Sequence, residues 1–261
     1  MQQVKFIEDS HEYFYGDKKL ISVSQFTSQF EEKKDWDKIA TKKAKSLGIS
    51  VEDLKSQWKA KADYSKMVGT LFHKNKELEL LDRGEDEYEG SILKIKCAQP
   101  GAIKYSIPIN ELEDNTCYPE LMIYDIENGI CGQSDKVIVK DNTINIIDYK
   151  SDKEISFQGF SNQFKKATKL LKPLDHLDEC NGNIYSIKMS LYMYMLWKAN
   201  RGRFKPGKII LEHMHLKRNE DGYPILENGL PIVTKTDIKY LPYRKREVED
   251  MIKYYNATKN P

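Results

Sequence analysis

The chain has 261 residues, of which 42 are lysine or arginine and 40 are aspartate or glutamate, so its formal net charge is +2. This near balance excludes neither a nucleic-acid-binding protein nor an ordinary enzyme, because only the local distribution of charge could separate them. A chain of this length can bury a sizeable core, and we expect one domain over residues 1–261.

Apolar segments and cysteines bear on where the protein works. No apolar run reaches the roughly 20 residues of a membrane-spanning helix, and residues 1–16 lack the apolar stretch of a secretory signal. The four cysteines are scattered without a C-x-x-C pair, which argues against a zinc ribbon, an iron–sulfur cluster or a disulfide framework. We therefore expect a cytoplasmic protein with reduced thiols and no membrane contact.

The first third of the chain combines a hairpin with helices. Residues 4–7 and 12–20 alternate in polarity around a turn-like segment, which predicts an N-terminal β-hairpin. Residues 24–81 have a helical pattern. Within it, Ser50 followed three residues later by Asp53 indicates the start of a helix, because a serine hydroxyl can accept a hydrogen bond from the first turn.

The middle of the chain predicts strands. Five strand-like runs follow the acidic stretch after Gly84, at 92–97, 103–109, 118–126, 130–140 and 143–149. An Asn-Gly pair at 128–129 and a polar turn at 140–142 join the last three runs. These short connections predict an antiparallel meander of three strands.

The last third predicts a helix over 185–198, a strand over 208–216, and a final helix over about 244–256. We expect an α/β fold with a central mixed sheet flanked by helices. Residues 65–217 would form its core, residues 1–64 a hairpin and a helical, arch-like addition, and residues 218–261 a C-terminal loop and helix.

Two adjacent predicted strands each carry an aspartate where the alternating apolar pattern is interrupted, Asp135 in GQSDKVIVK and Asp148 in TINIIDYKSDK. Two converging carboxylates and the main-chain carbonyl of Tyr149 would supply oxygen ligands that suit Mg²⁺ better than zinc. Lys150 lies two residues after Asp148 and so shares its face of the strand. An ammonium there could stabilise charge on a phosphorus under attack by water. The ordinary alternative is a solvated strand pair.

Histidines offer two further sets of ligands. The predicted helix MVGTLFHKNKELELL places His73 and Glu77 one turn apart, so His73 could bind the same metal with Glu77 in support. A helix-face histidine bonded to a carboxylate is the alternative. His213 and His215 share one face of a predicted strand and could chelate a metal, although neither a cysteine pair nor an H-E-x-x-H helix accompanies them.

The order of these motifs resembles the PD-(D/E)XK nuclease superfamily, in particular its RecB-like branch of phage and mitochondrial genome-maintenance exonucleases. The resemblance covers most of the chain. Residues 69–77, GTLFHKNKE, match a G-T-x-x-H-x-x-x-E helix, residues 132–135 match a G-x-x-D strand, and residues 148–150 match a D-x-K strand. The resemblance implies a restriction-endonuclease-like core.

The resemblance also implies roles for individual residues. His73, Asp135 and Asp148 would bind one or two Mg²⁺ or Mn²⁺ ions, and Lys150 would assist the attacking water. Glu120, within Pro119-Glu120-Leu121, would act in metal binding or in substrate positioning.

One motif departs from the family pattern. The family continues with a Y-x-x-Q-x-x-x-Y helix near the scissile phosphate, whereas residues 185–192 read YSIKMSLY, with Lys188 in place of the glutamine. We expect Lys188, Tyr192 and Thr70 to contact DNA, the lysine as a point charge. The departure keeps open an alternative, a weak or inactive nuclease-fold module that binds DNA or a partner protein.

Lysines are frequent between residues 33 and 66 and alternate with aromatic residues, among them Trp58 beside Lys59. Such a helical region could guide a DNA strand, with lysines on the backbone and an aromatic ring against an unpaired base. The alternative is a solvated helix face with its tryptophans in the core.

We therefore expect metal-dependent hydrolysis of phosphodiester bonds in single- or double-stranded DNA. Exonuclease action is favoured, because the resemblance is to the RecB-like branch and no separate sequence-reading module is visible. RNA hydrolysis is another alternative. The expected setting is DNA recombination, repair or replication in the cytoplasm of a bacterium or a phage-infected host. A homo-oligomer and a single-strand-binding or annealing partner protein are compatible with this reading.

Overall fold

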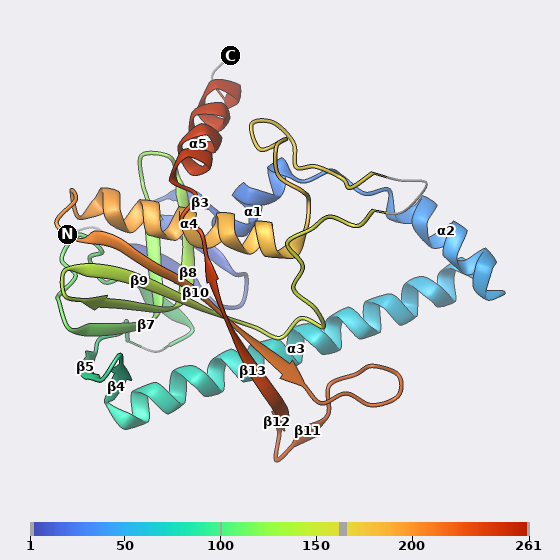
Figure 1. Cartoon of the computed structure of the whole chain (residues 1–261), viewed down its shortest axis with the longest axis horizontal. Helices are drawn as coiled ribbons and strands as arrows, with labels where there is room; N and C mark the ends of the chain where they lie inside the picture. Colours follow the sequence, from blue (N-terminus) through green and yellow to red (C-terminus); the bar gives the residue numbers. More distant parts are fainter. Residues whose placement is uncertain (1–2, 100, 162–165, 260–261) are drawn as a thin grey trace.

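The structure, a computed structural model, describes residues 3–99, 101–161 and 166–259. A large mixed, curled β-sheet occupies the centre, and helices lie on both of its faces (Figure 1). This arrangement confirms the predicted α/β class with a mixed sheet flanked by helices.

The main part of the sheet consists of β5 (Ser91–Ile95), β7 (Thr116–Asp125), β8 (Ile130–Lys140), β9 (Thr143–Lys150), β10 (Lys205–Leu216) and β13 (Val233–Leu241). The predicted meander is confirmed, because β8 pairs antiparallel with both β7 and β9. The connection from β9 returns through α4 (Asn181–Ala199) to β10, which lies parallel to β9.

The N-terminal segment forms a meander of three strands, β1 (Val4–Ile7), β2 (Glu12–Tyr15) and β3 (Lys18–Ser22), and β6 (Ile103–Tyr105) pairs with β1. The predicted single strand over 12–20 was wrong. Gly16, with a φ of 59°, lets the chain turn there. β3 then pairs in parallel with the start of β8 and joins this meander to the main sheet.

The predicted helical stretch divides into α1 (Val23–Thr27), the 3-10 turn η1 (Ser28–Phe30), α2 (Trp36–Leu47) and α3 (Val51–Arg83). Gly48 ends α2 with a φ of 67°, which a residue without a Cβ adopts at little cost. The predicted start at Ser50 is confirmed, since its side chain accepts a hydrogen bond of 2.9 Å from the Asp53 amide.

Replacing Ser50 with alanine should lower the free energy of unfolding by about 1 kcal/mol, because the first turn of α3 would lose this acceptor. Denaturant titration measures the change. Ser46→Ala is a matched control, because the Ser46 hydroxyl is exposed and only donates to the Lys43 carbonyl of its own helix. Equal losses in the two variants would contradict the assignment of Ser50 as a stabilising cap.

Two apolar clusters hold the helices on the sheet. Leu191 of α4 packs in one cluster with Ile146 and Leu211, and Phe72 of α3 packs in the other with Ile147. Ile144 and Ile146 of β9 face α4. Because side chains alternate between the two faces of a strand, Asp148 and Lys150 lie on the same face of β9 as these isoleucines. The core packing thereby fixes the direction in which the D-x-K residues point.

The C-terminal part differs from its prediction. Residues 218–243 were expected to form a loop, but they contain β13, which pairs with β10 over most of its length, and a short hairpin of β11 (Leu226–Glu227) and β12 (Leu230–Pro231). The sequence signal is weak because β13 is a largely exposed edge strand with polar residues. β4 (Glu85–Tyr88), also unpredicted, pairs with β5.

The predicted final helix is confirmed as α5 (Lys245–Lys259), which projects from the α4 side of the sheet (Figure 1). Over the part of the chain that the structure describes, none of the helices combines the length and apolar character needed to cross a membrane.

Candidate metal centre

Three carboxylates lie side by side on the meander. Pro119 pairs with Lys136 and Leu121 with Ser134 across β7 and β8, so Glu120 lies opposite Asp135. The last pair in the β8–β9 ladder is Lys136 with Ile147. Because these strands are antiparallel, Asp135, which precedes Lys136, lies opposite Asp148, which follows Ile147. Strand register therefore brings Glu120, Asp135 and Asp148 to one place in the sheet.

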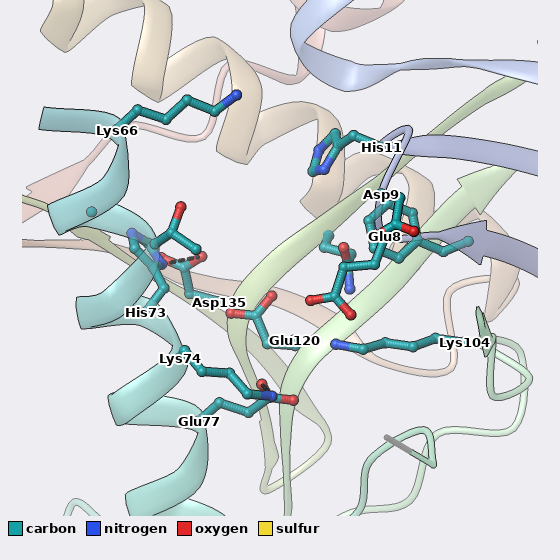
Figure 2. A pocket seen from close by; sticks show the side chains of 14 residues that line it. Glu8, Asp9, His11, Lys66, His73, Lys74, Glu77, Lys104, Glu120 and Asp135 are labelled. Carbon is teal, nitrogen blue, oxygen red and sulfur yellow. Dashed lines mark hydrogen bonds and ion pairs between the residues drawn. The ribbon is translucent and has the colours of Figure 1, made fainter. Parts of the chain in front are cut away.

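α3 adds a histidine to these acids. His73 Nδ1 lies 3.2 Å from Asp135 Oδ1, and the potential ligand atoms of His73, Glu120 and Asp135 all lie within 4.8 Å of one another (Figure 2). The second oxygen of Asp135 accepts a hydrogen bond of 2.6 Å from the Tyr149 amide, which fixes the carboxylate. We call His73, Glu120, Asp135 and Asp148 the acidic centre.

Glu120 has an unusual backbone conformation for a residue within a strand. Its φ is 46°, in the left-handed region that glycine favours. A non-glycine residue held there costs on the order of 1–3 kcal/mol, which the surrounding structure must supply. Figure 2 shows the Glu120 side chain in the middle of a cavity, beside Asp135. The strained backbone thus accompanies a side chain directed at the candidate ligands.

Burial and mutual repulsion disturb the ionisation of these acids. Burial, together with the charge of Asp135, raises the pKa of Glu120 to about 8 and that of Asp148 to about 6. Burial opposes ionisation of Asp135 too, but the hydrogen bond from His73 and the charge of Lys150 outweigh it and hold its pKa below the usual value. Simultaneous ionisation of all three carboxylates is therefore unfavourable, and a bound divalent cation would relieve their mutual repulsion.

Lys150 lies against the acidic centre. Its ammonium forms an ion pair with Asp148, donates to the Tyr149 carbonyl at 3.1 Å, and lies 5.3 Å from the centre of the Tyr185 ring. Burial lowers the pKa of Lys150, but the charges of Asp148 and Asp135 outweigh it and raise the pKa above the usual value. The side chain is therefore a fixed cation. The Tyr149 carbonyl, expected as a metal ligand, accepts a hydrogen bond from this ammonium.

α4 closes the opposite side of the site. Tyr185 and Tyr192 both project from it, and the charges of Asp135 and Asp148 act on Tyr192, whose pKa burial raises well above its usual value. Lys188 is half-buried, which lowers its pKa, and it feels the charges of Glu31, Lys150 and Asp148. The structure thus brings the two expected α4 residues, Lys188 and Tyr192, to the edge of the acidic centre.

Replacing Gly132 with alanine should destabilise the fold by about 1–3 kcal/mol, as overpacking of a core does. A Cβ at this position would lie 2.6 Å from Tyr192 Oη and 3.1 Å from Val23 Cγ2. Gly207→Ala, where a Cβ would meet the Ile144 carbonyl at 2.8 Å, is the control for a clash away from the centre. Thermal unfolding measures both. Only Gly132→Ala should also weaken Mn²⁺ binding, because it displaces Tyr192 at the edge of the acidic centre, and equal Mn²⁺ affinity in the two variants would contradict that reading.

A cavity of about 650 Å³ opens in front of the centre, between α3 and the turn that joins β1 to β2 (Figure 2). Thr70 and Glu77 of α3 line it, as does Lys66, the last of the lysines expected to guide DNA. The lining also includes residues that sequence reasoning did not select: Glu8, Asp9, His11, Lys74, Lys104 and Gln133. No local motif marks Glu8, Asp9, His11 or Lys104, because the pairing of β1 with β2 and β6 places them here.

A comparison of the chain with protein-family models gives no match, and a comparison with curated proteins gives none either. The geometry of the acidic centre, the cavity and the neighbouring cations is therefore the basis for inferring a function.

Two of the expected DNA contacts lie elsewhere. Trp58 packs edge-to-face on Trp36 of α2, with ring centres 6.3 Å apart, and Lys59 forms an ion pair of 2.7 Å with Asp63. Along the axis of α3, Trp58 is about 22 Å from His73, at 1.5 Å per residue. The structure therefore places Trp58 and Lys59 outside the cavity and the acidic centre, because one helix is too straight and too long to bring both regions together.

Proposed function

We propose that this protein is a metal-dependent DNA nuclease of the PD-(D/E)XK type with a restriction-endonuclease-like core, acting as an exonuclease on DNA ends. The observation that carries the proposal is the alignment of Glu120, Asp135 and Asp148 on three successive strands, with His73 against Asp135 and Lys150 against Asp148. Hydrolysis of a phosphodiester needs charge stabilisation and an activated water, and this set of residues suits both tasks.

The residues fit a hard divalent cation. His73, Glu120 and Asp135 would hold it, because their ligand atoms converge within 4.8 Å, and Asp148 adds a neighbouring carboxylate. A donor set dominated by carboxylate oxygen favours Mg²⁺ or Mn²⁺ over zinc. When bound, such an ion supplies Lewis-acid polarisation of the phosphoryl oxygen and activation of water.

The chain itself supplies a fixed positive charge. Lys150 remains an ammonium because Asp148 and Asp135 surround it, so it is suited to stabilise negative charge on a phosphoryl group rather than to remove a proton. Asp148 and the Tyr149 carbonyl hold that ammonium in place from two sides. The pre-set position means that little reorganisation is required as charge develops.

Cations around the cavity are suited to a phosphate backbone. Lys66, Lys74 and Lys104 line it, and Figure 2 shows Lys66 and Lys104 extending from opposite sides of it. Lys188 approaches the acidic centre from α4. Lysines bind phosphate without reading base sequence, which is consistent with a nuclease that acts on many sequences. The cavity is open to solvent, as entry of a chain end requires.

The test uses purified protein and four substrates of matched sequence: end-labelled linear duplex, linear single strand, covalently closed circle, and RNA. Each is incubated with Mg²⁺, with Mn²⁺ or with EDTA. We expect loss of linear DNA in either metal, intact circles, and no reaction in EDTA. Cleavage of circles would replace the exonuclease with an endonuclease, and preferential cleavage of RNA would change the substrate. DNA binding that persists in EDTA without any cleavage in metal would refute catalysis and leave a binding module.

A further inference from the structure

A second cluster of potential ligands lies where β10 pairs with β13. His213 faces Asp237 across this antiparallel ladder, and His215 follows two residues later on the same face of β10. The potential ligand atoms of His213, His215 and Asp237 lie within 4.8 Å of one another, and the two imidazole rings are 4.3 Å apart between centres. The proposed nuclease chemistry uses none of these three side chains.

The hydrogen bond of His213 determines which ring nitrogen is free. Its Nε2 lies 2.8 Å from the Asp152 carbonyl oxygen. Because a carbonyl can only accept, Nε2 must carry the proton and donate, which leaves the lone pair of a neutral ring on Nδ1. Donation to a carbonyl from one nitrogen is the usual way in which a metal-binding histidine is oriented for its other nitrogen. Only 3% of His213 is exposed, so its ring is held in this orientation.

The other two residues leave the cluster open to solvent. His215 Nε2 lies 2.8 Å from Asp237 Oδ2, and Lys235 holds the other Asp237 oxygen, Oδ1, at 2.6 Å. About a third of each side chain is exposed, 36% for His215 and 31% for Asp237. The cluster is therefore partly open to solvent at His215 and Asp237.

We propose that His213, His215 and Asp237 bind a transition-metal ion of the Zn²⁺ class. Two imidazole nitrogens and one carboxylate oxygen form a ligand set typical of such ions, with a fourth position for water on the exposed side. The acidic centre has one imidazole among its carboxylates and suits a harder ion. The protein thus has two metal sites of different chemical preference, and this second site does not depend on nuclease activity.

The second site would have a structural effect. His213 is bonded to the Asp152 carbonyl, Tyr185 donates to the Asp152 carboxylate at 2.7 Å, and Arg218 donates to the Ser151 carbonyl at 3.2 Å. These contacts hold the segment that directly follows Lys150. An ion on His213 would fix its ring further and join that segment to β10 and β13, so bound Zn²⁺ raises the thermal stability of this protein.

Zinc titration by calorimetry, in buffer with excess Mg²⁺, tests the site. Every titration uses a protein that already carries His73→Ala and Asp135→Asn, here called the background, so that the acidic centre cannot contribute to Zn²⁺ binding. We expect a single Zn²⁺ ion to bind, and Co²⁺ to give the visible absorption of a nitrogen-ligated site. His215→Ala and, separately, Asp237→Asn should weaken binding about tenfold or more, since loss even of a ligand's hydrogen-bond partner has effects of that size.

His176→Ala is the matched control, because His176 also contacts a carboxylate, Glu247, at 3.6 Å but lies outside the cluster. It should bind Zn²⁺ as the background does. Circular dichroism verifies that each variant is folded. If His215→Ala unfolds, Asp237→Asn still tests the site, because asparagine has the shape of the native aspartate side chain. Unchanged affinity in the folded Asp237→Asn variant, or an equal loss in His176→Ala, would overturn the proposal.

Discussion

Replacing Lys150 with methionine should lower the single-turnover rate of DNA cleavage by about 100- to 1,000-fold, the usual effect of removing one preorganised charge-stabilising group. Methionine keeps much of the side-chain volume in the space between Asp148 and the Tyr185 ring, so the loss reports on the charge. Rates measured at saturating Mn²⁺ separate this effect from weaker metal binding.

Lys153→Met is the matched control for Lys150→Met. Lys153 follows β9 by three residues and is exposed, so its removal should leave the rate unchanged. The proposed role of Lys150 would be contradicted if the two variants were equally active, or if Lys150→Met regained full activity at high Mn²⁺.

Mn²⁺ at about one hundred times its Kd should stabilise the wild-type protein by about 2.7 kcal/mol, because the ion binds the folded state. For a chain of this size that corresponds to roughly 5 °C in Tm. Asp135→Asn should abolish the shift, since Asp135 contacts His73 and lies beside both Glu120 and Asp148. Thermal unfolding with and without Mn²⁺ measures it.

The matched change for Asp135→Asn is Asp141→Asn, another replacement of a carboxylate by an amide. Asp141 lies in the exposed turn after β8, with a φ of 52° that asparagine also tolerates. This variant should keep the full Mn²⁺ shift. A shift that persists in Asp135→Asn would place the cation elsewhere, at His213, His215 and Asp237 for example.

The features that sequence reasoning anticipated depend on neighbouring residues. The tight turns at 127–129 and 140–142 determine the pairing of β7, β8 and β9, and this pairing is why Asp135 and Asp148 could be expected to meet. The cap at Ser50 likewise depends on residues three positions apart. Glu120 followed from the family resemblance alone, but its left-handed backbone gave no sequence signal.

Features that depend on distant contacts could not be predicted. Two such features shape the lining of the cavity: the parallel pairing of β3 with β8, and the position of the β1–β2 turn beside α3. Both join segments that are far apart in the sequence. β13 contains β-branched and aromatic residues that favour strands, but polar residues separate them and most of its side chains are exposed, and its pairing with β10 joins segments that are distant in sequence. Trp58 was expected near DNA from composition, whereas the length of α3 sets it apart from His73.

The central claim is that the acidic centre and Lys150 hydrolyse DNA with a divalent cation. The most direct measurement is the initial rate of cleavage of end-labelled linear DNA by the wild type, Asp135→Asn and Asp141→Asn, each in Mn²⁺ and in EDTA. We expect Mn²⁺-dependent cleavage by the wild type and Asp141→Asn, and a rate for folded Asp135→Asn that is lower by about 1,000-fold. Equal rates in Asp135→Asn and the wild type, or cleavage that persists in EDTA, would contradict the claim.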